Sequence, residues 1–134
     1  MLAVSNLQAA YGAAKVLFDI SLTINAGEVV TLLGRNGMGK TTTINAIMGL
    51  IHPTGGTITF DDRPMAGQPS YRIAQAGIGL VPEGRQIFPT LTVEENLIAT
   101  ARPGLWDLAS VFRTFPRLAE RRGNMGTALS GGEQ

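Results

Sequence analysis

Residues 34–41, Gly-Arg-Asn-Gly-Met-Gly-Lys-Thr, constrain the fold of this chain more than any other stretch. They have the spacing G-x-x-x-x-G-K-T, in which glycines let the backbone curl so that successive N–H groups converge on a phosphate. In this pattern Lys40 places an ammonium group on the terminal phosphates and the Thr41 hydroxyl is a ligand of Mg²⁺. The expected phosphate-binding residues are Asn36, Gly37, Gly39, Lys40, Thr41 and Thr42.

The flanking sequence supports a strand-loop-helix unit. The continuous apolar run at residues 29–33 is typical of a strand that is buried on both faces. Apolar residues after the loop recur at the spacing of one helix face: Ile44, Ile47, Met48 and Ile51. The sequence therefore predicts an α/β fold of the P-loop NTPase kind, with the loop opening a helix whose dipole favours the phosphate.

The end of the chain carries a second motif, Leu-Ser-Gly-Gly-Glu-Gln at residues 129–134. Ser130 and Glu133 have the S-x-x-E spacing of a capping box, and Gly131 and Gly132 leave the N–H groups of a first turn open to an outside anion. The stretch resembles the signature motif of ABC-type ATPases.

The resemblance extends along the whole chain. Tyr11 stands where this family places the aromatic residue that stacks on adenine, and Val16 where an aliphatic residue lines the same base. The residues from Gly49 to Gly56 resemble the family's turn after the P-loop helix. The resemblance implies that the chain binds ATP and Mg²⁺.

Residues 81–89 and 91–97 are similar to the ATPases of bacterial branched-chain amino acid importers, of the LivF type. Most ABC ATPases carry glutamine at the position of Glu83, where it senses Mg²⁺ and the attacking water. Glutamate departs from that general pattern but suits this subgroup. The resemblance implies catalytic roles for Lys40 and Glu83, with Thr41 and Glu83 in the metal region.

The family works as pairs of ATPase subunits. The resemblance implies that two subunits sandwich two ATP molecules, each held by one partner's P-loop and the other's turn at Ser130, Gly131, Gly132 and Glu133. The implied partners are a second ABC ATPase subunit, identical or not, transmembrane permease subunits and, indirectly, a periplasmic binding protein. The alternatives are an ABC ATPase for another substrate such as lipid or lipopolysaccharide, a soluble ABC protein of translation or DNA repair, and an inactive nucleotide-binding module.

Composition limits the other possibilities. The 134 residues suit one domain, 1–134, and the net charge of +1 gives no sign of a nucleic-acid surface. The chain has no cysteine, so it holds neither a disulfide nor a thiolate metal site. No apolar run approaches the roughly 18 residues of a membrane span, and no signal peptide precedes the first strand. We expect a cytoplasmic protein that reaches the inner face of the membrane through its permease.

The resemblance also implies elements that this sequence does not hold: a strand ending in the catalytic glutamate, and a switch histidine. The only histidine, His52, falls in the turn after the P-loop helix, where we expect a solvated side chain. Asp61 and Asp62 follow an alternating apolar pattern, which predicts a hairpin turn more than a metal site. The chain thus looks like an ATPase fragment, truncated at the signature, and we expect no ATP turnover from residues 1–134 alone.

The rest of the chain predicts two further parts. Residues 2–11 and the alternation of Phe18, Ile20, Leu22 and Ile24 predict an antiparallel β subdomain, with a turn at residues 25–27 and a second core strand at residues 78–81. A partial helical subdomain is expected from about residue 90 to 134, with a capping box at Thr92 and Glu95 and breaks at Pro103 and Pro116. Within it we expect a solvated arginine face, with an anion site as the alternative (Arg113, Arg117, Arg121, Arg122). We also expect core aromatics, with contact between one of them and a membrane subunit as the alternative that the resemblance implies (Trp106, Phe112, Phe115).

Overall fold

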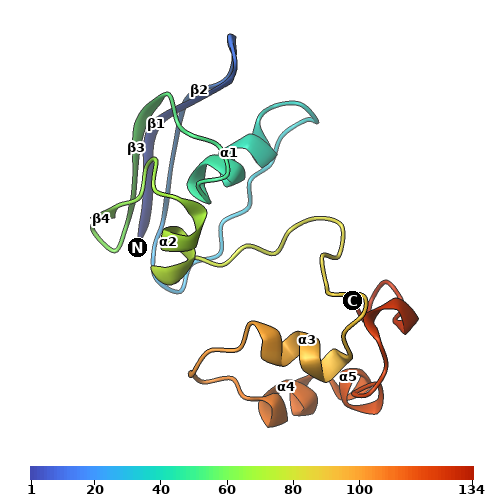
Figure 1. Ribbon diagram of the computed structural model, residues 1–134. Helices are drawn as coiled ribbons and strands as arrows, with labels where there is room; N and C mark the ends of the chain where they lie inside the picture. Colours follow the sequence, from blue (N-terminus) through green and yellow to red (C-terminus); the bar gives the residue numbers. More distant parts are fainter. The chain divides into compact units, whose positions relative to one another are not determined.

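The computed structural model describes all residues, 1–134, and divides them into two compact units, Met1–Leu80 and Val81–Gln134. Figure 1 shows the strands in the first unit and most of the helices in the second. No helix in either unit combines the length and apolar character that crossing a bilayer requires.

The first unit is built on a four-stranded antiparallel sheet in the order β2-β1-β3-β4. The strands are β1 (Leu2–Tyr11), β2 (Ala14–Ile24), β3 (Gly55–Phe60) and β4 (Arg63–Pro64). Asp61 and Asp62 join β3 to β4 with positive φ angles of 46° and 61°, as a two-residue hairpin turn requires. The predicted antiparallel subdomain and this hairpin turn are therefore confirmed.

Two bulges change which side chains face the core. On β1 the buried positions are Leu2 and Val4 and then Leu7 and Ala9, because Asn6 adopts a positive φ of 50° and shifts the register.

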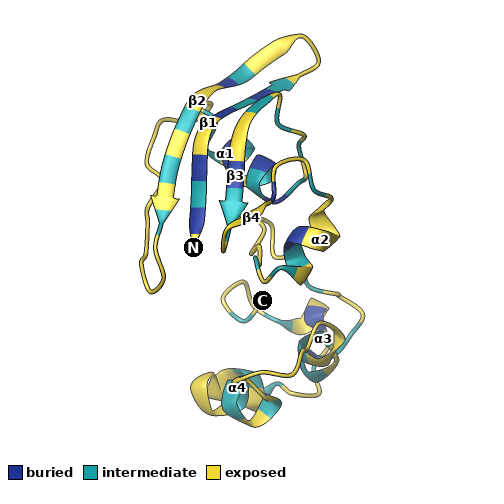
Figure 2. Cartoon of the chain, turned by 90° about the vertical axis from the view of Figure 1, so that its left-hand side faces the viewer, coloured by how far each residue is buried: buried dark blue, intermediate teal, exposed yellow.

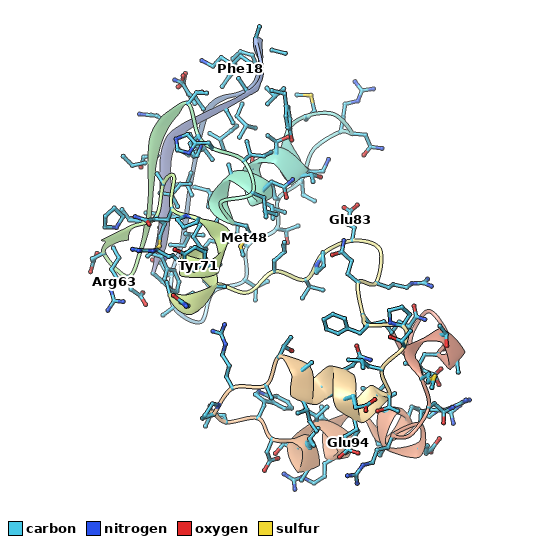
Figure 3. All side chains as sticks on the ribbon, in the orientation of Figure 1. Phe18, Met48, Arg63, Tyr71, Glu83 and Glu94 are labelled. Carbon is cyan, nitrogen blue, oxygen red and sulfur yellow. The ribbon has the colours of Figure 1, made fainter.

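On β2 the second bulge lies at Asp19, which has a positive φ of 54°. As a result, Leu17 is buried and Phe18 points outward. The prediction that Phe18 shares a face with Ile20, Leu22 and Ile24 is therefore wrong for Phe18, which is 63% exposed. Figure 3 shows Phe18 near the hairpin end of the β1–β2 pair. The Nζ atom of Lys15 lies 5.2 Å from the centroid of its ring.

This register predicts that substitutions at two neighbouring residues lower the free energy of unfolding by very different amounts. Leu17→Ala is expected to lower the free energy of unfolding by about 2–4 kcal/mol, because it opens a cavity under the sheet. Phe18→Ala is expected to cost about 0.5 kcal/mol or less, as for an ordinary surface change. Denaturant unfolding of both variants measures the difference, and equal losses would show that Phe18 is buried after all.

Two helices, α1 (Lys40–Ile47) and α2 (Ser70–Gln75), cover one face of the sheet. The core lies between them and the sheet; Figure 2 shows its buried stretches on β1, β3, α1 and α2. Its buried residues are Leu2, Val4, Leu7, Ala9, Leu17, Ala46, Met48, Ile58, Met65 and Ile73. The P-loop helix is thus confirmed, but it is shorter than the apolar spacing predicted: it ends at Ile47, and Ile44 is exposed.

The two predicted core strands are not formed. Residues 29–33 follow the turn at Gly27 without pairing with any strand, and Val29 and Leu33 are 93% and 85% exposed. Residues 78–81 are likewise unpaired. Strands buried on both faces need hydrogen-bonding neighbours and a layer on each side, and the sheet of this unit continues to β4 instead of toward these segments.

The second unit contains α3 (Val93–Ala99), α4 (Leu108–Thr114), α5 (Pro116–Glu120) and a 3₁₀ turn (Gly126–Ala128). The predicted capping box opens α3: the Thr92 hydroxyl accepts from the N–H of Glu95, and the Glu95 carboxylate accepts from the N–H of Thr92. The backbone N–H of Thr92 is the main reason that the pKa of Glu95 is lowered. The breaks at both prolines are confirmed, since α3 ends before Pro103 and Pro116 is the first residue of α5.

The charged and aromatic predictions for this unit have different outcomes. The arginines form a solvated face, because Arg113, Arg117 and Arg122 are exposed. On this face Arg117 pairs with Glu120 and Arg122 with Glu94. Figure 3 labels Glu94, which lies on α3. The aromatic prediction is wrong for Trp106 and Phe115, which are exposed, while Phe112 is half-buried.

Candidate nucleotide-binding site

The G-x-x-x-x-G-K-T stretch forms a loop that leads directly into α1, as the sequence predicted. Lys40 is the first residue of the helix, and its ammonium group folds back into the loop, donating to the carbonyls of Gly34 at 2.6 Å and Arg35 at 2.9 Å. No side chain caps the start of α1. The first N–H groups of this helix are therefore open to an anion, and the lysine charge is already within the loop.

Gly39 fixes the loop against the sheet. Its φ of 83° lies in the left-handed region, and a β-carbon added there would lie 2.6 Å from Cδ2 of Leu17 and 3.4 Å from the carbonyl oxygen of Val16. The loop thus touches β2 at the residue predicted to line the base. Val16 is half-buried at this point.

Tyr11 lies at the same end of the sheet. It is the last residue of β1, pairs with Ala14 across the hairpin and is 55% exposed, so its ring is open to a ligand. The structure therefore brings three predicted parts of the site together. The β1–β2 hairpin joins Tyr11 to Val16, and Gly39 places the phosphate loop against β2 at Val16. Within the loop, Asn36, Gly37 and Thr41 are exposed and Thr42 is half-buried.

The two predicted metal-region residues belong to different units. Thr41 lies on the first turn of α1 in the first unit, and Glu83 lies in an exposed turn near the start of the second unit. Figure 3 shows Glu83 on the loop that precedes α3. The Glu83 carboxylate makes no hydrogen bond or ion pair, so it is free to take a ligand.

A short ladder joins the segment after Glu83 to the segment before the signature motif. The N–H of Thr127 donates to the carbonyl of Pro89, that of Gly126 to Leu91, and that of Val93 to Asn124. Thr92 and Met125 form an antiparallel bridge in the middle of this ladder. As a result, residues 89–93, which follow the Glu83 turn, and residues 124–127, which precede the signature motif, are held side by side within one unit.

Asn96 supports this ladder, and the sequence did not reveal its role. Its side-chain amide accepts from the N–H of Phe88 and donates to the carbonyls of Phe88, Leu91 and Thr92. The only signal in the sequence is its place in the first turns of a capped helix, where an asparagine can reach the preceding loop. Asn96 thus fixes the backbone just after the Glu83 turn.

The signature residues form a turn rather than a helix. The Glu133 carboxylate accepts from the N–H of Ser130 at 2.8 Å, and the N–H of Glu133 donates to the Ser130 carbonyl at 3.0 Å. Only half of the predicted capping box is therefore present, because the Ser130 hydroxyl does not accept from Glu133. The Ser130 N–H is the main reason that the pKa of Glu133 is lowered, and Arg121 lies 3.7 Å from its carboxylate.

The fold and the loop define a class of protein. A G-x-x-x-x-G-K-T loop that opens a helix, with the lysine ammonium group inside the loop, is the arrangement of a P-loop nucleotide-binding protein. The comparison with protein families then gives the particular family: residues 17–134 match the family described as ABC transporter. The chain belongs to this family.

Two curated relatives show how closely the chain is matched. The chain is 37% identical to the high-affinity branched-chain amino acid transport ATP-binding protein BraG of Pseudomonas aeruginosa, covering 100% of this chain and 60% of that protein. It is 39% identical to the lipopolysaccharide export system ATP-binding protein LptB of Haemophilus influenzae, covering 100% of this chain and 58% of that protein. The chain therefore spans about three fifths of the length of these relatives.

Solved structures agree with the family assignment. A structure described as an ATP-binding subunit of an ABC transporter superimposes with a TM-score of 0.82 at 34% identity, covering 98% of this chain and 57% of the other. The ADP conformation of MJ1267, an ATP-binding cassette of an ABC transporter, superimposes with a TM-score of 0.80 at 27% identity, covering 99% and 60%. The predicted ABC ATPase fold class is therefore confirmed.

Proposed function

We propose that this chain provides the ATP-binding half of the nucleotide site of an ABC transporter ATPase subunit. The observation that carries the proposal is the position of the Lys40 ammonium group inside a loop that opens α1, with Tyr11 and Val16 at the same end of the sheet. Asn36, Gly37, Gly39 and Thr42 hold the phosphates together with Lys40. Tyr11 and Val16 hold the base, while Thr41 and Glu83 take the Mg²⁺ region.

Two subunits act together in this proposal. A second ATPase subunit, identical or not, presents Ser130, Gly131, Gly132 and Glu133 to the nucleotide held by the first. Closure of the pair moves the transmembrane permease subunits at the inner face of the membrane, and hydrolysis resets them. A solved relative at 25% identity is described as the dimeric post-hydrolysis state of a cassette bound to ADP and phosphate, with a TM-score of 0.76.

The proposed cargo is a branched-chain amino acid delivered by a periplasmic binding protein. The first support is the similarity to BraG, and the second is Glu83 with the sequence that follows it, which resembles the ATPases of such importers. Lipopolysaccharide export is the second candidate, because the LptB of Haemophilus influenzae is 39% identical.

Transport and hydrolysis assays on the complete gene product test the proposal. Phosphate release should require Lys40 and stop in Lys40→Ala, and deletion of the gene should abolish uptake of labelled leucine. The matched control is Lys15→Ala, which removes the same charge from an exposed position on β2. Normal leucine uptake with lipopolysaccharide retained at the inner membrane would favour the second candidate, and phosphate release unaffected by Lys40→Ala would contradict both.

Tyr11 gives a separate prediction for base binding. Tyr11→Ala is expected to weaken ATP binding by about five- to 150-fold, the range for losing about 1–3 kcal/mol of base–aromatic stacking. Tyr11→Trp should lose little, because it keeps a flat aromatic face. Titration of a fluorescent ATP analogue into the complete gene product measures both, and equal affinity for the alanine variant and the wild type would remove Tyr11 from the site.

A further inference from the structure

Arg85 is a cation of the second unit that takes no part in the nucleotide contacts proposed above. It follows Gly84 in the turn after Glu83, with a positive φ of 51°, and its carbonyl accepts from the N–H of Ile87 at 2.7 Å. The ladder between residues 89–93 and 124–127 brings this turn next to the signature motif. Arg85 makes no ion pair, unlike Arg117, Arg121 and Arg122 of the same unit.

The guanidinium group of Arg85 lies directly against Gly131. A β-carbon added to Gly131 would be 2.5 Å from Nη2, 2.6 Å from Cζ and 2.7 Å from Nη1 of Arg85. Only a residue without a side chain lets the guanidinium approach the turn so closely. The contact therefore joins a free arginine to the middle of the signature motif.

The groups around this contact are donors. The N–H groups of Gly131 and Gly132 make no hydrogen bond within the chain, whereas those of Ser130, Glu133 and Gln134 are all engaged. The acid of the same turn, Glu133, accepts from the N–H of Ser130, and its carboxylate lies 3.7 Å from Arg121. An anion at the turn would thus meet two free N–H groups and an unpaired guanidinium, a donor set that suits phosphate.

We propose that Arg85 is a further nucleotide-contacting residue of the signature half of the site, and that its guanidinium binds the phosphates of the ATP held by the partner's P-loop. This inference rests on the proposed function, because it needs two subunits around a shared nucleotide. It adds a positively charged side chain, from the turn after Glu83, to the signature residues Ser130, Gly131, Gly132 and Glu133. ATP-driven pairing of the subunits therefore depends on Arg85, while binding of ATP to the P-loop of a single subunit does not.

The test compares Arg85→Met, which keeps the alkyl chain and loses the charge, with Arg113→Met, which removes the same charge from α4 as a matched control. In the complete gene product with a slowly hydrolysed ATP analogue, light scattering should show dimer formation weakened about 10- to 100-fold by Arg85→Met, the range for losing hydrogen bonds to a charged group. Arg85→Lys should recover part of this loss. Affinity for a fluorescent ATP analogue at low protein concentration should stay unchanged.

Four other results of this comparison would overturn the role of Arg85. If Arg85→Met forms dimers as well as the wild type does, Arg85 only packs against the turn and binds no nucleotide. If Arg85→Met forms dimers more strongly, Arg85 blocks the turn in the wild type. Either result overturns the proposal. If the wild-type protein binds no ATP analogue, the proposed function itself is wrong and the role of Arg85 falls with it. An effect of Arg113→Met as large as that of Arg85→Met would show a general charge effect and also overturn the assignment.

A second pair of variants tests the contact itself. Gly131→Ala should displace the guanidinium, so it should weaken dimer formation in the wild-type background more than in the Arg85→Met background. Additive losses in the two backgrounds would show that the glycine and the arginine act independently, which contradicts the proposed contact.

Discussion

Gly39→Ala is expected to weaken ATP binding at least tenfold. A β-carbon at Gly39 would lie 2.6 Å from Cδ2 of Leu17, which is fully buried under the sheet and has little room to move. The left-handed backbone, with φ of 83°, costs a residue with a β-carbon roughly a further 1–2 kcal/mol. The loop would therefore leave the conformation that aims its N–H groups at the phosphates.

Gly34→Ala is the matched control, because Gly34 belongs to the same motif. An added β-carbon there meets nothing closer than 3.8 Å, and Gly34 is not among the glycines with positive φ. We expect the affinity of Gly34→Ala for a fluorescent ATP analogue to stay within about threefold of the wild type, since a surface change of this kind costs about 0.5 kcal/mol or less. Equal losses in the two variants would mean that the motif requires glycine for a reason other than the Leu17 contact.

The second large effect is self-association of the 134-residue polypeptide in isolation. Residues 29–33 form an exposed, mainly apolar stretch whose backbone N–H and C=O groups have no strand partner, with Val29 and Leu33 93% and 85% exposed. Unpaired apolar segments of this kind invite pairing between chains. We expect light scattering to show large species that grow with protein concentration.

Charges placed in this segment should prevent the association. Val29→Lys combined with Leu33→Lys is expected to return the polypeptide to a monodisperse monomer, because a charge in the pairing segment opposes stacking of strands. Leu105→Lys is the control: Leu105 is 98% exposed but stands in the loop before α4, outside any strand segment. An unmodified polypeptide that stays monomeric, or a control variant that is equally effective, would contradict the prediction.

The local motifs could be predicted from sequence because their geometry depends on residues close together in the chain. The phosphate loop leading into α1, the hairpin turn at Asp61 and Asp62, and the capping box of Thr92 and Glu95 were each predicted and are each present. Their glycines, turn residues and side-chain caps act over three to eight residues, so spacing alone specifies them. Tyr11 and Val16 were named from a resemblance, and their roles in the site remain proposals.

The features that could not be predicted from the sequence depend on contacts between residues far apart in the chain. Bulges at Asn6 and Asp19 shift the register between β1 and β2, so a regular alternation did not reveal that Leu17 is buried and Phe18 exposed. The same limit applies to residues 29–33, whose apolar composition predicts a buried strand although burial requires neighbours that hydrogen-bond to it.

The contact of Arg85 with Gly131 likewise depends on the ladder that joins two segments about 35 residues apart in the chain. The sequence by itself therefore determined the family and the local motifs, because short-range geometry is encoded residue by residue. Only the tertiary structure decided which side chains are buried and which charges meet, because burial and pairing belong to the contacts between segments.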